Sequence, residues 1–167
     1  IDLNGDDTQG VNVQAVDELQ LFADLGFGTF EETENLTDLY VDENTGDLYF
    51  ASVDDPDNKI ELIDFNGFNF GINAEEGFRP IAIEALNDPS LATHYFYEGY
   101  VLLTYDEYYE ELVAFGFNDQ GYIIHDLGPL NYDSQAISEA ENLFGFDFNG
   151  DGVQGRNVQA FDTEGYL

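Results

Sequence analysis

The sequence predicts a mainly β fold, a compact antiparallel β domain with one short helix. Short runs rich in Val, Ile, Phe and Tyr alternate with turns that contain Gly, Asn and Asp, which is typical of strands joined by hairpins. One stretch near the C-terminal end instead spaces its apolar residues as a helix does. A third observation, a motif that occurs at both ends of the chain, indicates how the fold is organised.

The clearest strand signal is a hairpin formed by residues 37–41 and 47–51. The turn between them, 43–46, reads Glu-Asn-Thr-Gly and carries the glycine that such turns require. Residues 11–22 alternate well enough to predict a strand before this hairpin, and the turn at 118–121 joins the last two strands. The further strands are expected at 60–65, 78–86, 93–97, 100–105, 111–117 and 122–125.

The single helix is expected just before Gly145. Asp133 and Ser134 can cap its first turn, because short oxygen-bearing side chains satisfy the free N–H groups of a helix start. The glycine ends it. Its apolar residues have helical spacing: Ala136, Ile137, Ala140, Leu143 and Phe144.

The charge is extreme for a folded chain of 167 residues. Three Lys plus Arg stand against 36 Asp plus Glu, which gives a formal net charge of −33. Chains with so much repulsion often remain disordered, yet 43% of these residues are hydrophobic and 16% are aromatic. We therefore expect a folded domain that needs counter-cations, from bound calcium or from a saline medium.

The same charge excludes several classes of partner. Only Lys59, Arg79 and Arg156 could meet phosphate, so the sequence predicts no binding to nucleic acid and no attraction to an anionic membrane surface. No apolar run is long enough to predict membrane insertion. The chain has no cysteine, which excludes disulfides and cysteine-ligated zinc.

An internal repeat is the most informative feature. Residues 1–17 read IDLNGDDTQGVNVQAVD and residues 146–162 read FDFNGDGVQGRNVQAFD, with 11 identities in 17 positions. The sequence therefore predicts two parts. Residues 1–145 form a single β-rich module that opens with the motif, and residues 146–167 hold the second motif and the start of a following repeat or a linking strand.

The motif Asp-x-Asn-Gly-Asp places oxygen atoms at alternate positions around a glycine turn. Calcium prefers about six to eight oxygen ligands, and EF-hand loops supply them from positions one, three, five and, through a carbonyl, seven. The helix before the second motif completes the prediction of an EF-hand-like calcium loop. The expected ligands are Asp2, Asn4, Asp6 and the Thr8 carbonyl in the first copy, and Asp147, Asn149, Asp151 and the Val153 carbonyl in the second.

Position twelve departs from an EF-hand loop, which carries a bidentate acid there. Both copies have Val at that position, so other residues must supply the missing oxygens. The nearest repeated acids are Asp17 and Asp162, and Glu139 or Glu141 on the incoming helix are further donors. The alternative is an acidic surface turn that binds no metal.

The segment Asp-x-Asn-Gly-Asp-Gly-x-x-Gly after a helix resembles the tryptophan-rich repeat domain of large secreted proteins of cyanobacteria and other aquatic bacteria. That family has a Gly-Trp-x-x-Ile-Ala-x-Glu stretch, and residues 77–84 are similar, with Phe78 in place of Trp. The aromatic strands at 95–97 and 112–117 match it loosely, and the chain has no Trp at all. The resemblance implies an extracellular, calcium-binding repeat.

These observations predict a non-enzymatic, extracellular or cell-surface structural module of a repeat-built surface protein, adhesin or filament. Calcium would rigidify the junctions between modules, and the partners would be neighbouring copies or modules of the same protein. The alternative is a carbohydrate-binding module whose Tyr-rich strands at 95–109 contact extracellular polysaccharide. A flat, exposed row of tyrosines would favour sugar. No motif of a zinc or serine hydrolase is present, and the many acids make any carboxylate pair uninformative.

Overall fold

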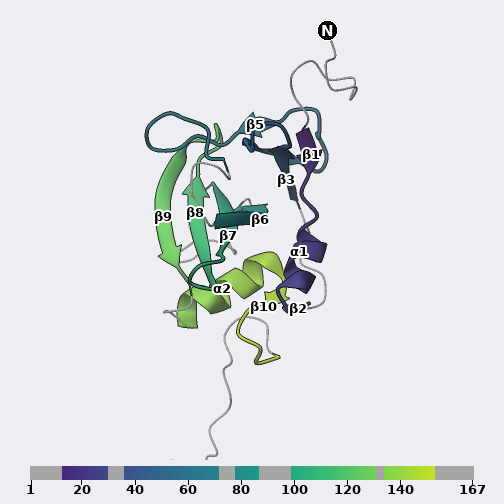
Figure 1. Ribbon diagram of the computed structural model, residues 1–167, viewed down its shortest axis with the longest axis vertical. Helices are drawn as coiled ribbons and strands as arrows, with labels where there is room; N and C mark the ends of the chain where they lie inside the picture. The colour runs from purple at the N-terminus through teal and green to yellow at the C-terminus, as the bar shows by residue number, and fades with distance from the viewer. Residues whose placement is uncertain (1–12, 30–35, 72–77, 87–98, 131–133, 153–167) are drawn as a thin grey trace, which may run out of the picture.

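A computed structural model describes residues 13–29, 36–71, 78–86, 99–130 and 134–152, which build three layers (Figure 1). A four-stranded sheet lies in the middle, a second four-stranded sheet covers part of one face, and two helices cover the other. The elements are β1 (Val13–Ala15), α1 (Glu18–Asp24), β2 (Gly28–Thr29), β3 (Thr37–Asp42), β4 (Leu48–Ser52), β5 (Ile60–Glu61), β6 (Phe78–Ala85), β7 (Tyr100–Asp106), β8 (Glu111–Phe117), β9 (Ile123–Pro129), α2 (Ser134–Phe144) and β10 (Phe146–Asp147).

The central sheet has the antiparallel order β6-β7-β8-β9 and is covered on both faces. Alternate side chains of a strand point to opposite faces, so a strand buried on both sides needs a continuous apolar run. In β8, Leu112 and Ala114 pack towards the helices, whereas Val113, Phe115 and Phe117 pack towards the other sheet. All seven residues of β8 are buried.

The second sheet has the order β1-β3-β4-β5. The expected hairpin of residues 37–51 is confirmed, because β3 and β4 pair antiparallel with Leu39 opposite Phe50. Gly46 in its turn has φ +80°, a conformation that glycine adopts without strain. The two sheets are also joined through the backbone, since Ile63 N–H donates to the Gly121 carbonyl at 2.7 Å and Ile123 N–H donates to the Ile63 carbonyl at 2.9 Å.

The prediction of a strand over residues 11–22 is wrong beyond Ala15. Residues 18–24 form α1, so the described chain has two helices where the sequence indicated one. The side chain of Asp17 accepts a hydrogen bond from Gln20 N–H at 3.1 Å and caps the helix start. Phe22 is fully buried against the central sheet and α2. The cap and the burial of Phe22 favour a helix here, although the alternating sequence pattern predicted a strand.

The predicted helix before Gly145 is confirmed as α2, which ends at Phe144. Gly145 has φ +78° and its N–H bonds to the Glu141 carbonyl at 2.9 Å, the expected geometry of a helix end. The chain then forms β10, which pairs with β2. Phe146 of β10 packs on Phe22 with a ring-centroid distance of 3.9 Å, so the start of the second motif belongs to the core.

The mainly β character is confirmed, and the strands expected at 78–86, 100–105 and 111–117 are found near their predicted positions. The strand expected at 60–65 covers only Ile60–Glu61, and the one expected at 122–125 extends to Pro129. The strand expected at 93–97 lies outside the described ranges. Residues 64–67, Asp-Phe-Asn-Gly, form a turn, as Gly67 N–H donates to the Asp64 carbonyl at 3.1 Å. Among the described residues, no helix is both long enough and apolar enough to cross a membrane.

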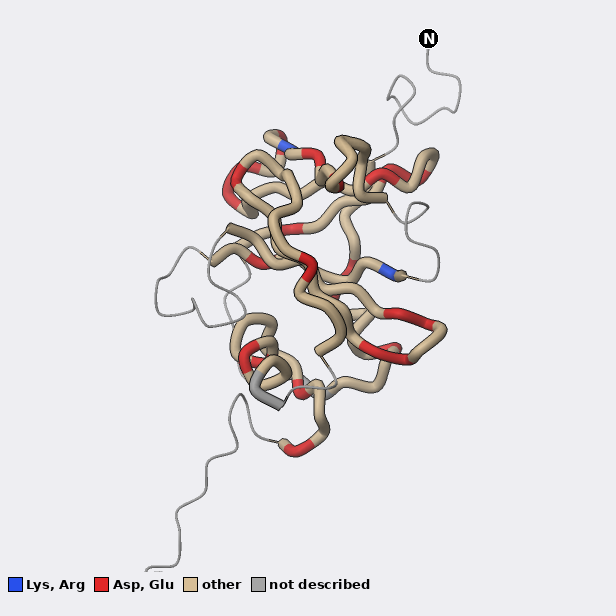
Figure 2. The backbone as a smooth tube through the Cα atoms, turned by 90° about the vertical axis from the view of Figure 1, so that its left-hand side faces the viewer, with Lys and Arg blue, Asp and Glu red and all other residues tan. Residues whose placement is uncertain are grey.

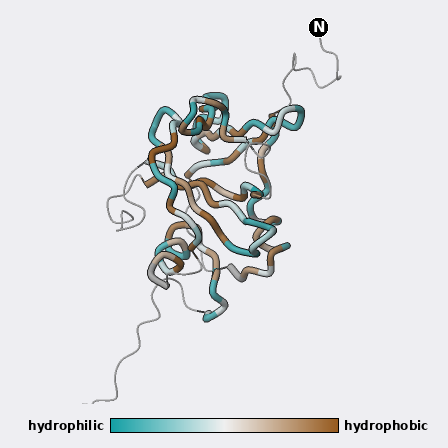
Figure 3. Tube along the Cα trace, turned by 60° about the vertical axis from the view of Figure 1, so that its left-hand side comes forward, coloured by the Kyte–Doolittle hydropathy of each residue, from teal (hydrophilic) through white to brown (hydrophobic). Residues whose placement is uncertain are grey.

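Acidic and apolar residues occupy different parts of the molecule. Many Asp and Glu positions lie in hairpin turns and loops (Figure 2). Hydrophobic positions follow the central strands and the helices (Figure 3). This separation is how a chain with a net charge of −33 keeps an apolar core.

Candidate metal centre

The second motif follows α2 directly, and this helix contributes an acid to it. Glu141 lies near the end of α2 and its side chain is 0% exposed. Its Oε2 accepts a hydrogen bond from Phe148 N–H at 3.0 Å, across the start of the loop. The helix end, Gly145 and β10 therefore fix this carboxylate beside the residues of the motif.

Asp147 organises the loop through its carboxylate. Its Oδ1 accepts a hydrogen bond from Gly150 N–H at 2.9 Å, and its Oδ2 accepts one from Gly152 N–H at 2.9 Å. Both glycines have positive φ, +75° and +73° respectively, which lets the backbone turn around the carboxylate. The Oδ1 of Asn149 accepts a hydrogen bond from Asp151 N–H at 3.1 Å.

Three carboxylates converge at this point. One oxygen from each of Glu141, Asp147 and Asp151 lies within 4.8 Å of the others. Glu141 is buried, Asp147 is half-buried and Asp151 is exposed, so the group opens to solvent on one side. Of the two candidate donors on the helix, Glu139 and Glu141, the cluster contains Glu141.

The electrostatics of the cluster favour a positive charge within it. Burial is the largest cause that raises the pKa of Glu141 to about 7, and a hydrogen bond with Asp147 and the charge of Asp151 act in the same direction. The described basic side chains are engaged elsewhere. Arg79 pairs with Glu107, and Lys59 Nζ lies 4.6 Å from the centre of the Tyr40 ring.

The other predicted ligands have different placements. Asp17 caps α1 and is not a member of the carboxylate cluster. Asp2, Asn4, Asp6, Thr8, Val153 and Asp162 lie outside the described residues. The ligand set of the first copy, the Val153 carbonyl and calcium itself therefore stay predictions.

No family model, no curated protein and no solved structure matches this chain. The resemblance to the tryptophan-rich repeat domain thus stays a prediction, as does the division of the chain at residue 145.

Sequence reasoning missed a second group of acids, at the junction of α1, β3 and β6. Glu84 of β6 is 6% exposed, and its carboxylate accepts a hydrogen bond from Leu36 N–H. Burial raises the pKa of Glu84 to about 9, and the charges of Glu18 and Asp38 act in the same direction. Burial likewise raises the pKa of Glu18 to about 7. No local motif marks these residues, because they come from three separate segments.

The described tyrosines do not form a flat row. Tyr100 packs on Phe50 with a ring-centroid distance of 4.4 Å, and Tyr105 is packed against the core beside the helices. Tyr108 and Tyr109 are exposed in the turn between β7 and β8, and their rings meet at 84°. Sugar binding therefore stays a prediction. Among the described tyrosines of residues 100–109, only the rings of Tyr108 and Tyr109 support it.

Proposed function

We propose that this chain is a non-enzymatic, calcium-binding structural module of a repeat-built extracellular surface protein, adhesin or filament. The observation that carries the proposal is the convergence of Glu141, Asp147 and Asp151 within 4.8 Å, with Glu141 fully buried. A buried carboxylate beside two others is costly unless a proton or a cation compensates it. A bound cation would let all three remain ionised.

The chemistry of the donors supports calcium among the cations. The cluster offers only carboxylate oxygens, and no His or Cys belongs to it. Hard oxygen donors suit calcium and magnesium, whereas zinc and copper prefer nitrogen and sulfur. Calcium also tolerates an irregular set of ligands, such as a loop plus one helix residue, better than magnesium does.

Glu141 gives the departure at position twelve a physical explanation. In the proposed site, Asp147, Asn149 and Asp151 supply side-chain oxygens from the loop, and Val153 supplies its carbonyl. Glu141 supplies the acid that the valine at position twelve does not, from the helix that precedes the loop. Asn149 would turn its Oδ1 from Asp151 N–H towards the ion.

The function would follow from linkage. A cation that binds only the folded loop stabilises it by mass action and removes the local repulsion between carboxylates. Because the loop of the second motif follows α2 directly, calcium would stiffen the connection between this helix and the segment after the loop. Extracellular calcium modules bind with Kd of about 10⁻⁴ to 10⁻³ M, which agrees with a site that is open on one side.

Thermal unfolding at low salt tests the proposal. We expect the Tm of the natural chain to rise when excess calcium replaces chelator, and magnesium to have a smaller effect. Asp147→Asn should remove this response. Asp64→Asn is the matched control, because Asp64 Oδ1 accepts N–H groups of a similar glycine turn, from Asn66 and Phe68, outside the carboxylate cluster. An equal Tm in calcium and in chelator would overturn the proposal.

A carbohydrate-binding module is the second candidate, and one observation favours it. Tyr108 and Tyr109 are 83% and 67% exposed at the tip of the β7–β8 hairpin, where aromatic rings can stack on sugar. Affinity electrophoresis in gels with acidic and neutral polysaccharides tests it. Retardation of the natural chain that Tyr108→Ala and Tyr109→Ala abolish would support sugar binding, and unchanged mobility in all gels would exclude it.

A further inference from the structure

One edge of the second sheet is formed by the short strand β1. β1 pairs antiparallel with β3 through Val13 opposite Asp42, Gln14 opposite Val41 and Ala15 opposite Tyr40. Val16 N–H continues the pairing with a hydrogen bond of 2.8 Å to the Leu39 carbonyl. The side chains of Gln14 and Ala15 are exposed. This strand is therefore a weakly buried edge segment, of the kind that strand exchange can replace.

The same residues occur a second time in the chain. Asn12-Val13-Gln14-Ala15 is repeated as Asn157-Val158-Gln159-Ala160, in the segment after the second motif. We propose that residues 157–161 add as a strand to the β3 edge of another copy of this module, in the place that β1 holds in its own copy. In this register Gln159 lies opposite Val41 of the partner copy.

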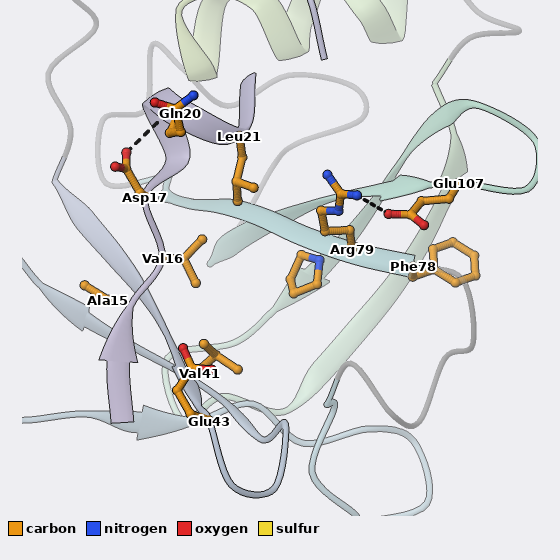
Figure 4. Close-up of a pocket in the computed structure, with 11 residues that line it drawn as sticks. Ala15, Val16, Asp17, Gln20, Leu21, Val41, Glu43, Phe78, Arg79 and Glu107 are labelled. Atoms are coloured by element: carbon orange, nitrogen blue, oxygen red, sulfur yellow. Dashed lines mark hydrogen bonds and ion pairs between the residues drawn. The ribbon is translucent and has the colours of Figure 1, made fainter. Parts of the chain in front are cut away.

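A groove beside β1 supports this occupant. It has a volume of about 550 Å³ and lies between β1, α1, the end of β3 and the start of β6 (Figure 4). Val16 lines it, together with the apolar side chains of Leu21, Val41, Phe78 and Pro80. The repeat has Phe161 at the position of Val16. The larger ring would fill space beside β3 that the valine leaves open, so the second copy of the strand would bury more apolar area than the first.

Charge also favours the second copy. The strand position of Val13 lies opposite Asp42, beside the β3–β4 turn that contains Glu43 and Asp47. Arg156 stands two residues before Val158, where the first copy has Val11. The incoming strand would therefore bring an arginine to an acidic turn, in a chain that has three basic residues in all.

Exchange would require little unfolding of the receiving copy. α1 is anchored by Phe22, which is 0% exposed in the core, so only residues 13–16 need to leave the β3 edge. Residues 163–167 read Thr-Glu-Gly-Tyr-Leu and do not repeat α1, so the incoming segment would supply the strand alone. Repetition of this step links copies head to tail. The inference rests on the assembly part of the proposed function and gives its partner and contact surface.

Engineered disulfides test the proposal directly, because the natural chain has no cysteine. In the double variant Val41→Cys with Gln159→Cys, mild oxidation should produce covalent dimers and larger oligomers on a non-reducing gel. The positive control is Val41→Cys with Gln14→Cys, which should close within one chain because these residues are opposite each other. The yield of oligomers should rise several-fold when Gln14→Pro, which removes a strand N–H, weakens the resident β1.

Two further variants separate strand exchange from random collision. Phe161→Ala should lower the oligomer yield, and Val16→Phe should lower it by filling the groove with the resident strand. Circular dichroism on each variant verifies folding. The proposal is overturned if the Val41–Gln159 variant stays monomeric at every concentration, with and without Gln14→Pro, while the control pair closes. The proposal is also overturned if neither Phe161→Ala nor Val16→Phe changes the yield of oligomers.

Each reaction is carried out in calcium and in chelator, so that the two proposals fail separately. Cross-linking in both conditions with an unchanged Tm would reject calcium and keep strand exchange. A Tm that responds to calcium without any cross-linked oligomer would reject strand exchange and keep the calcium site.

Discussion

The acids at the end of α2 and the acids between α1, β3 and β6 share a composition but differ in what surrounds them. The first group, Glu141, Asp147 and Asp151, includes a glycine turn whose N–H groups point at Asp147, and it opens to solvent at Asp151. The second group contains Glu84, which is buried beside the charges of Glu18 and Asp38 and accepts a hydrogen bond from Leu36 N–H.

The difference shows two ways in which one chain can offset the charge repulsion between clustered carboxylates. An open group with preformed oxygen donors can exchange its proton for a cation from solvent. In the group between the packed elements, burial raises the pKa of Glu84 to about 9, so this carboxyl keeps its proton at neutral pH. The first group should therefore respond to calcium and the second to pH.

The largest loss of stability is expected for Phe22→Ala, because Phe22 packs beside the elements that carry both acidic groups. Phe22 lies on α1 with Glu18, and its ring lies 3.9 Å from that of Phe146 and 5.5 Å from that of Phe148, centroid to centroid. Removal of a buried Phe ring costs about 3–5 kcal/mol. Urea unfolding measures this loss. Phe68→Ala is the control, since that ring is 72% exposed and its removal should cost about 0.5 kcal/mol or less.

The second-largest effect is expected for Glu84→Gln, which should raise the free energy of unfolding at high pH. The folded pKa of about 9 exceeds the ordinary value of 4.5, so the folded state binds more protons between these values. The free energy of unfolding of the natural chain must then fall as pH rises through this window. An uncharged Gln removes the fall, so the stability that it adds should grow by up to about 1.4 kcal/mol per pH unit across this window.

Urea unfolding at pH 5, 6.5 and 8 measures the Glu84→Gln effect. The gain should be small at pH 5 and should grow with pH. Glu43→Gln, at an exposed position of the β3–β4 turn, removes the same charge without a buried group and should leave the pH slope unchanged. A gain of equal size at all three pH values would show that the effect is packing and not titration.

Glu141→Gln should act in opposite directions with and without calcium. In chelator it removes repulsion between carboxylates and should stabilise the chain by about 1 kcal/mol. In calcium it removes a proposed ligand, and the calcium-dependent rise in Tm should shrink. Calorimetric scans of the natural chain and the variant, in chelator and in calcium, measure these two changes in Tm. Glu139→Gln removes the same charge from the same helix but outside the carboxylate cluster, so it should shift both scans equally.

The smallest effect is expected for Arg79→Ala, which removes the ion pair with Glu107. Both side chains are about half exposed, at 42% and 52%, so solvent screens the pair. We expect a loss of about 0.5 kcal/mol, below the other three effects. A loss several times larger in urea unfolding would mean that surface charge pairs, rather than the two buried groups, dominate the electrostatics.

The strands of the central sheet were accessible to sequence reasoning because their patterns are strong. The run Glu111–Phe117 is apolar at almost every position, and the β3–β4 hairpin has a turn that only a few residue types form. α1 was missed because the alternation in residues 11–22 predicted a strand, and the cap that starts the helix depends on one hydrogen bond from Gln20 N–H.

The two acidic groups differ in the same way. The loop motif keeps Asp147 and Asp151 close in sequence, and a preceding helix brings Glu141 within reach, so the spacing indicated all three as candidates. Glu84, Glu18 and Asp38 meet only because β6 packs against α1 and β3. Among 36 acids, no local signal separates them from the exposed ones.

The full burial of β8 has a consequence for how the molecule opens. A strand that is covered on both faces exchanges its amide protons only when the whole domain unfolds, whereas a three-residue edge strand such as β1 exchanges through local opening. Amide exchange should therefore be slowest in β8 and fast in β1. The module would release its edge many times during the life of one folded core, so its contacts with neighbours would be remade without any cycle of refolding.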